Sequence, residues 1–212
     1  MQNFKSKITK FISIMGLVTL LSLITIGCSN KQNSTTSQSD KISIVTTTNV
    51  YSDIAKNIVG KYGTATAIID KSSVDPHDFD PTTADAKKVA QANIIVANGL
   101  GYDSWMNKLA KSVDKKPVLV GEDLMGLKNG DNPHIWYNLD MPTKYVDYLV
   151  KCLSKLDKRH AAYFKENGEK YLAKIDKIKQ LAKANKGDQK PVFVSEPVFD
   201  YALQEAGYKI GD

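Results

Sequence analysis

Residues 41–60 read KISIVTTTNVYSDIAKNIVG, and this stretch decides the fold class. Its first seven residues, 41–47, are mostly β-branched and alternate in polarity, which is typical of a strand. Residues 51–59 then carry apolar side chains at helical spacing: Ile54, Ala55, Ile58 and Val59. A strand that leads directly into a helix is the repeating unit of α/β proteins, so this stretch predicts a βα unit.

The same alternation of strand and helix continues along the chain. Further strands are predicted at 64–69, 94–97, 117–120 and 191–194, and further helices at 82–92, 105–113, 143–156, 161–184 and 198–206. Thr82 and Asp85 have the spacing of a capping box at a helix start. We therefore expect an α/β fold with mainly parallel sheets.

A long helical pattern at 161–184 divides the chain into two predicted lobes. One face of this helix is apolar, and the other is rich in lysine and interpreted as solvated. We expect an N-terminal lobe at 41–160, a linking helix at 161–187 and the start of a C-terminal lobe at 188–212. The last stretch holds one βα unit, whereas a lobe usually needs ~50 residues or more. We therefore expect an incomplete second lobe and some exposed apolar surface on the linking helix. The alternative is that this last piece packs onto the first lobe.

Residues 1–27 have the features of a bacterial lipoprotein signal peptide. Residues 1–10 contain three lysines and no acid, residues 11–26 are almost wholly apolar, and Gly27 stands directly before Cys28. Cys28 would be the first mature residue and would carry the lipid. An uncleaved membrane anchor is the alternative, although the apolar run is shorter than the ~20 residues of a spanning helix.

The segment that follows, 28–40, is predicted to be a lipidated cysteine with a polar, flexible tether. The formal net charge of the chain is +6, and half of it comes from the three lysines of the signal peptide. This charge is too weak and too dispersed to predict nucleic-acid binding. With Cys28 lipidated, Cys152 has no partner for an intramolecular disulfide, and we expect it to be a small buried side chain.

The first loop that could carry chemistry reads DPHDFDPT, residues 75–82. It places the imidazole of His77 among three carboxylates, between two prolines. In open α/β sheets ligands bind beyond the carboxyl ends of the strands, where this loop is expected. The alternative is that the aspartates only build turns and cap the following helix, with His77 in solvent.

Two further loops contain similar groups. NPHIW, residues 132–136, places His134 after a proline and near Trp136; the alternative is a turn histidine beside a core tryptophan. Ser195-Glu196-Pro197 places a carboxylate between a strand and a helix, although a glutamate is favoured near any helix N-terminus. The third histidine of the chain, His160, lies in a basic helical stretch and is expected at the surface. Two imidazoles and a carboxylate on rigid loops indicate a divalent transition-metal site.

Together these motifs resemble a known family, the metal-binding lipoproteins of ABC importers (the cluster A-I, or cluster 9, solute-binding proteins). The resemblance rests on the lipobox cysteine, on IVTTTNVYSDIAKNI at 44–58, on the two Pro-His motifs in order and on the later Ser-Glu. It implies two α/β lobes joined by one long rigid helix, with the metal between them. It also implies His77, His134 and Glu196 as metal ligands. The family's fourth ligand, an aspartate near the chain's end, has no counterpart by motif, and Asp212 is not a match.

The resemblance implies Mn²⁺ or Zn²⁺ as transported cargo. Zinc members usually have a histidine as third ligand and a histidine-rich loop between the first two ligands, and this chain has neither feature. A carboxylate at Glu196 makes the site harder and favours Mn²⁺, although most N/O sites bind Zn²⁺ more tightly in vitro. We expect manganese, with zinc a close second. Trp136 and Phe79 are expected to limit the access of water to the ligands.

The resemblance further implies a binding protein without enzymatic activity. It would be anchored by lipid on the extracellular face of the cell membrane and would deliver its metal to the membrane permease of an ABC importer. Two alternatives remain open. A metal-dependent hydrolase would need an open coordination position with a base beside it, and a surface adhesin lipoprotein would leave the paired Pro-His loops unexplained.

Overall fold

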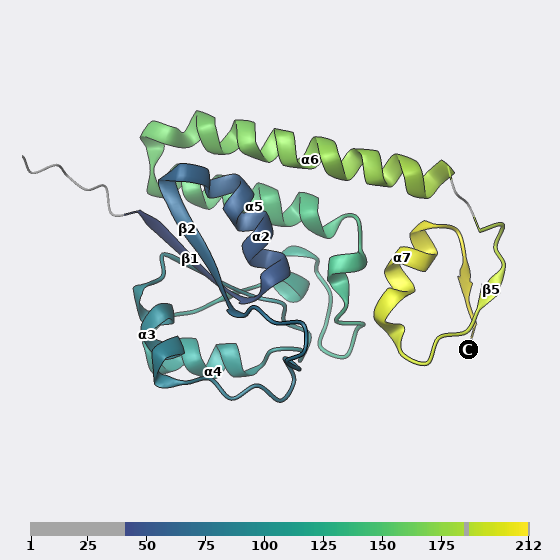
Figure 1. Ribbon diagram of the computed structural model, residues 1–212, viewed down its shortest axis with the longest axis horizontal. Helices are drawn as coiled ribbons and strands as arrows, with labels where there is room; N and C mark the ends of the chain where they lie inside the picture. Colours follow the sequence, from purple (N-terminus) through teal and green to yellow (C-terminus); the bar gives the residue numbers. More distant parts are fainter. Residues whose placement is uncertain (1–40, 185–186, 212) are drawn as a thin grey trace, which may run out of the picture. The chain divides into compact units, whose positions relative to one another are not determined.

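The computed structural model describes residues 41–184 and 187–211 (Figure 1). The predicted signal peptide, Cys28 and the tether up to residue 40 lie outside the described residues, as does Asp212. In the described residues, no helix is both long enough and apolar enough to cross a membrane.

Four parallel strands form the first sheet, in the order β2-β1-β3-β4. Their bounds are β1 (Ile42–Thr48), β2 (Gly63–Ile69), β3 (Ile94–Ala97) and β4 (Val118–Leu119). In the register of the central strand, Ile44 lies opposite Ala65 on β2 and Ile94 on β3. The predicted α/β class with a parallel sheet is confirmed. Because the strands are parallel, their carboxyl ends share one edge, and the loops that leave this edge can build a site.

Helices cover both faces of this sheet (Figure 1). One layer consists of α2 (Asn49–Val59), α5 (Met141–Leu156) and α6 (Ala161–Ala184), and the other of α3 (Thr83–Gln91) and α4 (Trp105–Ser112). Successive residues of β1 point to opposite layers: Ile44 packs in a core cluster with α2 and α5, whereas Val45 packs in a second cluster with α3 and α4. This burial on both faces explains why β3, with the sequence IIVA, is apolar without interruption.

The predicted capping box at the start of α3 is confirmed. The Asp85 backbone N–H donates to Thr82 Oγ1 at 3.3 Å, and the Thr82 N–H donates to Asp85 Oδ2 at 3.0 Å. The helix begins where these two bonds satisfy free backbone donors of its first turn. The fourth strand is shorter than predicted, because the chain leaves the sheet after Leu119 and forms a π-helical turn (Val120–Leu124).

The segment 187–211 forms a small second sheet of two parallel strands, β5 (Pro191–Val192) and β6 (Lys209–Ile210). Between them lie a 3₁₀ turn, η5 (Pro197–Phe199), and the short helix α7 (Asp200–Glu205). The predicted strand and helix of this segment are therefore present, although the strand is shorter than predicted, and the strand β6 was not predicted.

The long helix α6 packs on the first layer through part of its length. Gly168 allows a close approach to α5, because a Cβ at this position would lie only 2.9 Å from Val150. Further along, the side chains of Ile178 and Leu181 are 48% and 63% exposed. The prediction that part of the apolar face of this helix is exposed is confirmed.

His160 lies at the surface, as predicted, but its side chain is only 29% exposed, because its ring stacks on Tyr62 at 3.6 Å between centroids and its Nδ1 lies 2.6 Å from Asp157 Oδ2. The prediction for Cys152 is wrong. Cys152 is half-buried rather than buried, because Leu149 and Leu153 occupy the fully buried stripe of α5 and Cys152 flanks it.

Candidate metal centre

The loop that carries His77 follows β2 and is held in place by hydrogen bonds and by ring packing. The indole Nε1–H of Trp105 donates to the carbonyl of Pro76 at 3.0 Å in a buried position. The backbone N–H of His77 donates to Asp75 Oδ1 at 2.9 Å, so Asp75 builds the turn. Phe79 packs on the indole of Trp105, with 4.8 Å between ring centroids. The His77 side chain itself is exposed and free to meet a ligand from solvent.

Hydrogen bonds from side-chain amides hold the loop that carries His134. The side-chain amide of Asn98, at the end of β3, donates to the carbonyl of Pro133 at 3.0 Å. Asn132 fixes the ring: its Oδ1 accepts the His134 backbone N–H at 3.0 Å and lies 2.8 Å from Nδ1 of the imidazole. The amide group of Asn132 is oriented by a third bond, in which its Nδ2 donates to Pro197 O at 2.7 Å.

This arrangement determines which nitrogen of His134 can bind a metal. Because Asn132 Oδ1 can only accept, the hydrogen of the neutral imidazole stands on Nδ1 and the free lone pair on Nε2. Burial lowers the pKa of the His134 imidazole from its ordinary value of 6.5, and His77 lowers it further, whereas Glu196 and Asp200 raise it. The net shift is downward, so the ring is neutral at pH 7, as a metal ligand must be.

Tyr102 lies close to both histidines. Its ring centroid is 4.8 Å from that of His77 and 6.2 Å from that of His134, and both contacts are edge-to-face. Trp136 packs 5.2 Å from His134 and also 5.2 Å from Tyr102. Two aromatic rings, those of Tyr102 and Trp136, thus pack against the His134 ring and reduce its contact with water.

Glu196 lies in the segment between β5 and η5, and its side chain is exposed. The segment is tied to the His134 loop by the bond to Pro197 and by the Tyr201 hydroxyl, which donates to Asn132 O at 3.1 Å. Asp200, which the sequence analysis did not select, is half-buried, and its Oδ1 has no hydrogen-bond partner in the part of the chain that the structure describes. Its position about one helical turn after Glu196 is the sequence feature from which Asp200 could have been selected.

The structure does not assemble the predicted ligands around one point. Across 41–184 and 187–211, no three His, Cys, Asp or Glu side chains are gathered closely enough to hold a metal ion. His77 and His134 share a neighbour in Tyr102, and Glu196 acts on His134 through its charge. The role of these three residues as ligands therefore stays a prediction.

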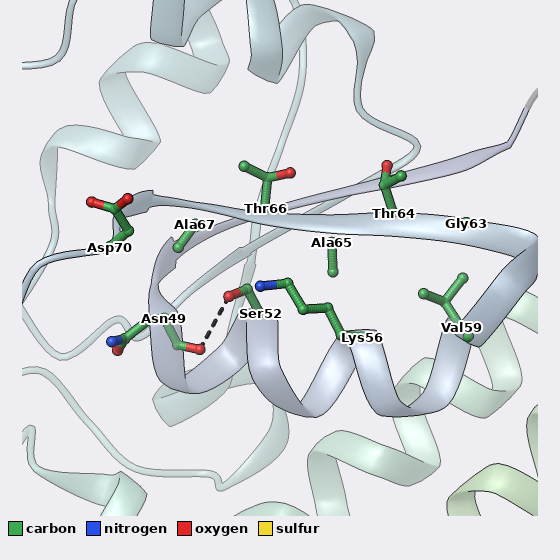
Figure 2. Close-up of a pocket in the computed structure, with 11 residues that line it drawn as sticks. Asn49, Ser52, Lys56, Val59, Gly63, Thr64, Ala65, Thr66, Ala67 and Asp70 are labelled. Carbon is green, nitrogen blue, oxygen red and sulfur yellow. Dashed lines mark hydrogen bonds between the residues drawn. The ribbon is translucent and has the colours of Figure 1, made fainter.

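One hollow lies near the carboxyl edge of the sheet, and another lies beside its outer strand β2. One, of about 560 Å³, adjoins the histidine loops and is lined by Thr48, Ile69, Asp75, Tyr102 and Trp136 among others. The other, of about 670 Å³, lies between α2 and the edge strand β2 (Figure 2). Figure 2 shows that Lys56 extends into this second hollow and that Asp70 is the carboxylate at its rim. Among the described residues, neither hollow is lined by a histidine, but Pro76 and Tyr102, which contact the proposed ligands or their loops, line the first and not the second.

Comparison with known proteins shows which proteins the chain is similar to. The sequence profile described as "Zinc-uptake complex component A periplasmic" (ZnuA) matches residues 44–211. The manganese ABC transporter substrate-binding lipoprotein PsaA of Streptococcus pneumoniae is 30% identical over 217 residues, which cover 93% of this chain and 69% of PsaA. A metal ABC transporter substrate-binding lipoprotein of Lactococcus lactis is 29% identical over 219 residues, covering 94% of this chain and 68% of that protein.

The chain is also similar in structure to a solved metal-dependent lipoprotein. The crystal structure of the metal-dependent lipoprotein YcdH from Bacillus subtilis superposes with a TM-score of 0.68 at 27% identity, covering 80% of this chain and 66% of YcdH. The chain spans about two thirds of the length of these three relatives. The chain therefore belongs to the family of the zinc-uptake complex component A, the metal-binding substrate-binding lipoproteins of ABC transporters.

Proposed function

We propose that the protein captures a divalent transition-metal ion outside the cytoplasm and delivers it to the permease of an ABC importer. One observation carries the proposal: two proline-braced histidines leave the same edge of a parallel sheet, and His134 is held neutral with Nε2 free. The relatives named as metal ABC transporter lipoproteins support the same conclusion.

His77, His134 and Glu196 are the proposed ligands. Two neutral imidazoles and one carboxylate suit a divalent first-row metal. The carboxylate of Glu196 compensates part of the positive charge of the ion. Trp136, packed on His134, limits the access of water, while Phe79 acts on the site through Trp105. Capture is binding without bond cleavage, so no activated water or general base is required.

The proposed cargo is Mn²⁺, with Zn²⁺ as the second candidate. A carboxylate as third ligand favours the harder ion, and PsaA is named as a manganese protein. The family description names zinc, and zinc also has the higher intrinsic affinity for most sites of this composition. The two ions are therefore best compared directly.

We further propose that the lipid on Cys28 anchors the protein at the outer face of the cell membrane. The relatives are named lipoproteins, and Gly27 stands directly before Cys28 after an apolar run. An anchored receptor stays near its permease, which raises the effective concentration of the metal complex there.

Calorimetric titration tests the capture of metal. Metal-stripped protein without the signal peptide, residues 29–212, is titrated with Mn²⁺ and with Zn²⁺, beside His77→Ala and His160→Ala. The second variant removes the one histidine that lies away from the proposed site, in contact with Tyr62. Binding that is lost in His77→Ala and retained in His160→Ala supports the proposal. A wild-type protein that binds neither ion contradicts it.

A further inference from the structure

We propose that one short segment, residues 98–105 (NGLGYDSW), sets the positions of both histidine loops and thereby the metal affinity of the site. The inference rests on the proposed function, because it concerns residues that position the proposed ligands and do not contact the metal. Asn98 and Trp105 are the positioning residues, at the two ends of the segment.

The two ends make the same kind of contact. Trp105 Nε1–H donates to the carbonyl of Pro76, the residue before His77. Asn98 Nδ2–H donates to the carbonyl of Pro133, the residue before His134. Each bond lies one peptide unit away from a proposed ligand, and each proline restricts the backbone at that point. The direction of each imidazole therefore depends on one side chain of the 98–105 segment.

The segment is rigid enough for this role. Gly99, Leu100 and Gly101 have φ angles of 81°, 57° and 82°, in the left-handed region that leucine rarely adopts. The loop is held in this conformation by carboxylates: Asp103 accepts the N–H groups of Asn98 and Gly99 at 2.7 and 2.9 Å, and Glu122 Oε1 accepts that of Leu100 at 2.9 Å. Such strained backbone persists only where the surroundings determine it.

Buried hydroxyl groups connect the segment to the core. The Tyr51 hydroxyl donates to Asn98 Oδ1, which leaves the Nδ2 group of Asn98 directed at Pro133. The Tyr145 hydroxyl donates in turn to the Tyr51 carbonyl at 3.3 Å. Asn98 and both tyrosines are fully buried, so the orientation of Asn98 is fixed by helices α2 and α5.

Tyr102, in the middle of the segment, adds a contact to each imidazole. Its ring meets the His77 ring at 78° and the His134 ring at 67°. A displacement of the segment would therefore move the shared neighbour of both rings together with the two carbonyl contacts. We expect a displacement of the whole segment to change the environment of both imidazoles.

Two substitutions test the two ends separately. Trp105→Phe removes the indole N–H and keeps an aromatic ring, and Asn98→Ala removes the amide donor. We expect each to weaken binding of Zn²⁺ and Mn²⁺ about 10- to 100-fold, as the loss of groups that orient metal ligands usually does. Asn167→Ala is the matched control, because it also removes an amide donor, to the carbonyl of Ile58 at 3.0 Å, and this bond touches neither histidine loop nor the 98–105 segment.

A second readout does not depend on metal. Imidazole ¹⁵N–¹H spectra of the metal-free protein report the tautomer and environment of each histidine. We expect Trp105→Phe to shift His77, Asn98→Ala to shift His134, and neither to shift His160. These spectra keep the inference testable even if the wild-type protein binds no metal and the proposed function fails.

The affinities and imidazole spectra of these variants decide whether the inference holds. Weakened binding in Trp105→Phe and Asn98→Ala, with near-normal binding in Asn167→Ala at a similar melting temperature, supports the inference. Unchanged affinity and unchanged imidazole spectra in both variants overturn it. Equal losses of affinity in all three variants also overturn it, because they would reflect general destabilisation.

Discussion

The part of the chain that carries His77 and His134 differs sharply from the part that carries Glu196. In the first, β1, β3 and α5 supply side chains such as Ile44, Val96 and Leu149 that are fully buried. In the second, no residue of β5, η5, α7 or β6 is buried, and Phe193 and Phe199 are 75% and 53% exposed. Two proposed ligands are thus fixed by a packed core, and the third lies on a segment held by few contacts.

The two parts of the proposed site differ in how firmly they are held. Buried donors hold the backbone of both histidine loops. The Glu196 segment is held to them mainly by Asn132 and Tyr201, so its movement costs little free energy. If the proposed ligands bind a metal, Glu196 is therefore the one whose position can adjust at least cost.

Hydrogen exchange should show the largest effect. We expect the amides of Ile44 and Val96, inside the first sheet, to exchange only through global unfolding, which costs ~5–15 kcal/mol in typical domains. The amides of β5 and β6 should exchange at least about 1,000-fold faster, through local opening. Exchange measured by mass spectrometry on peptides from both parts checks this. Equal protection in the two parts would remove the basis of the comparison.

Truncation of apolar side chains should show a smaller contrast. Leu149→Ala leaves a cavity in the fully buried face of α5 and should lower the free energy of unfolding by about 2–5 kcal/mol. Phe193→Ala removes a ring that is 75% exposed and should change it by no more than about 0.5 kcal/mol. Guanidinium denaturation of both variants and the wild type gives the two values. A loss of more than about 2 kcal/mol in Phe193→Ala would mean that the second part is better packed than its exposure indicates.

The smallest effect concerns the pH dependence of stability in the packed part. The hydrogen bond from His160 lowers the pKa of Asp157 below its ordinary value of 3.8, against a smaller opposing effect of burial, and Arg159 lowers it further. The ionised carboxylate therefore stabilises the fold above about pH 4, and the stabilisation is lost as the pH falls through the lowered pKa.

Asp157→Asn should accordingly reduce the melting temperature at pH 7 and have a diminishing effect toward pH 3. Melting curves across this range, with Asp147→Asn as the control for an exposed aspartate of α5, measure the difference. A deficit in Asp157→Asn that grows as the pH falls would contradict the assignment of this carboxylate.

The sequence alone was sufficient for the features that depend on neighbours in the chain. The periodicity of 51–59, the cap at Thr82 and the proline before each histidine are local patterns, and the structure has the corresponding helix, capping box and turns. The parallel sheet followed from the alternation of strands and helices.

Features that depend on distant contacts could not be predicted. Asn98 meets Pro133 across 35 positions, and His160 is covered by Tyr62, which belongs to another part of the chain. No spacing rule links such residues, because their approach is decided by how the helices pack on the sheet. For the same reason Tyr102 was not selected, although it lies near the proposed site. Asp200 differs, because its spacing from Glu196 was a local signal that could have been used.

The position of both buried donors on one octapeptide has a consequence for redesign. A protein engineer who wished to alter the site would not need to graft two separate loops, since exchange of residues 98–105 would re-aim both imidazoles in a single step. Conversely, an insertion of one residue into this octapeptide would disturb both at once. The octapeptide thus couples two loops that are far apart in the sequence, although it contains none of the proposed ligands.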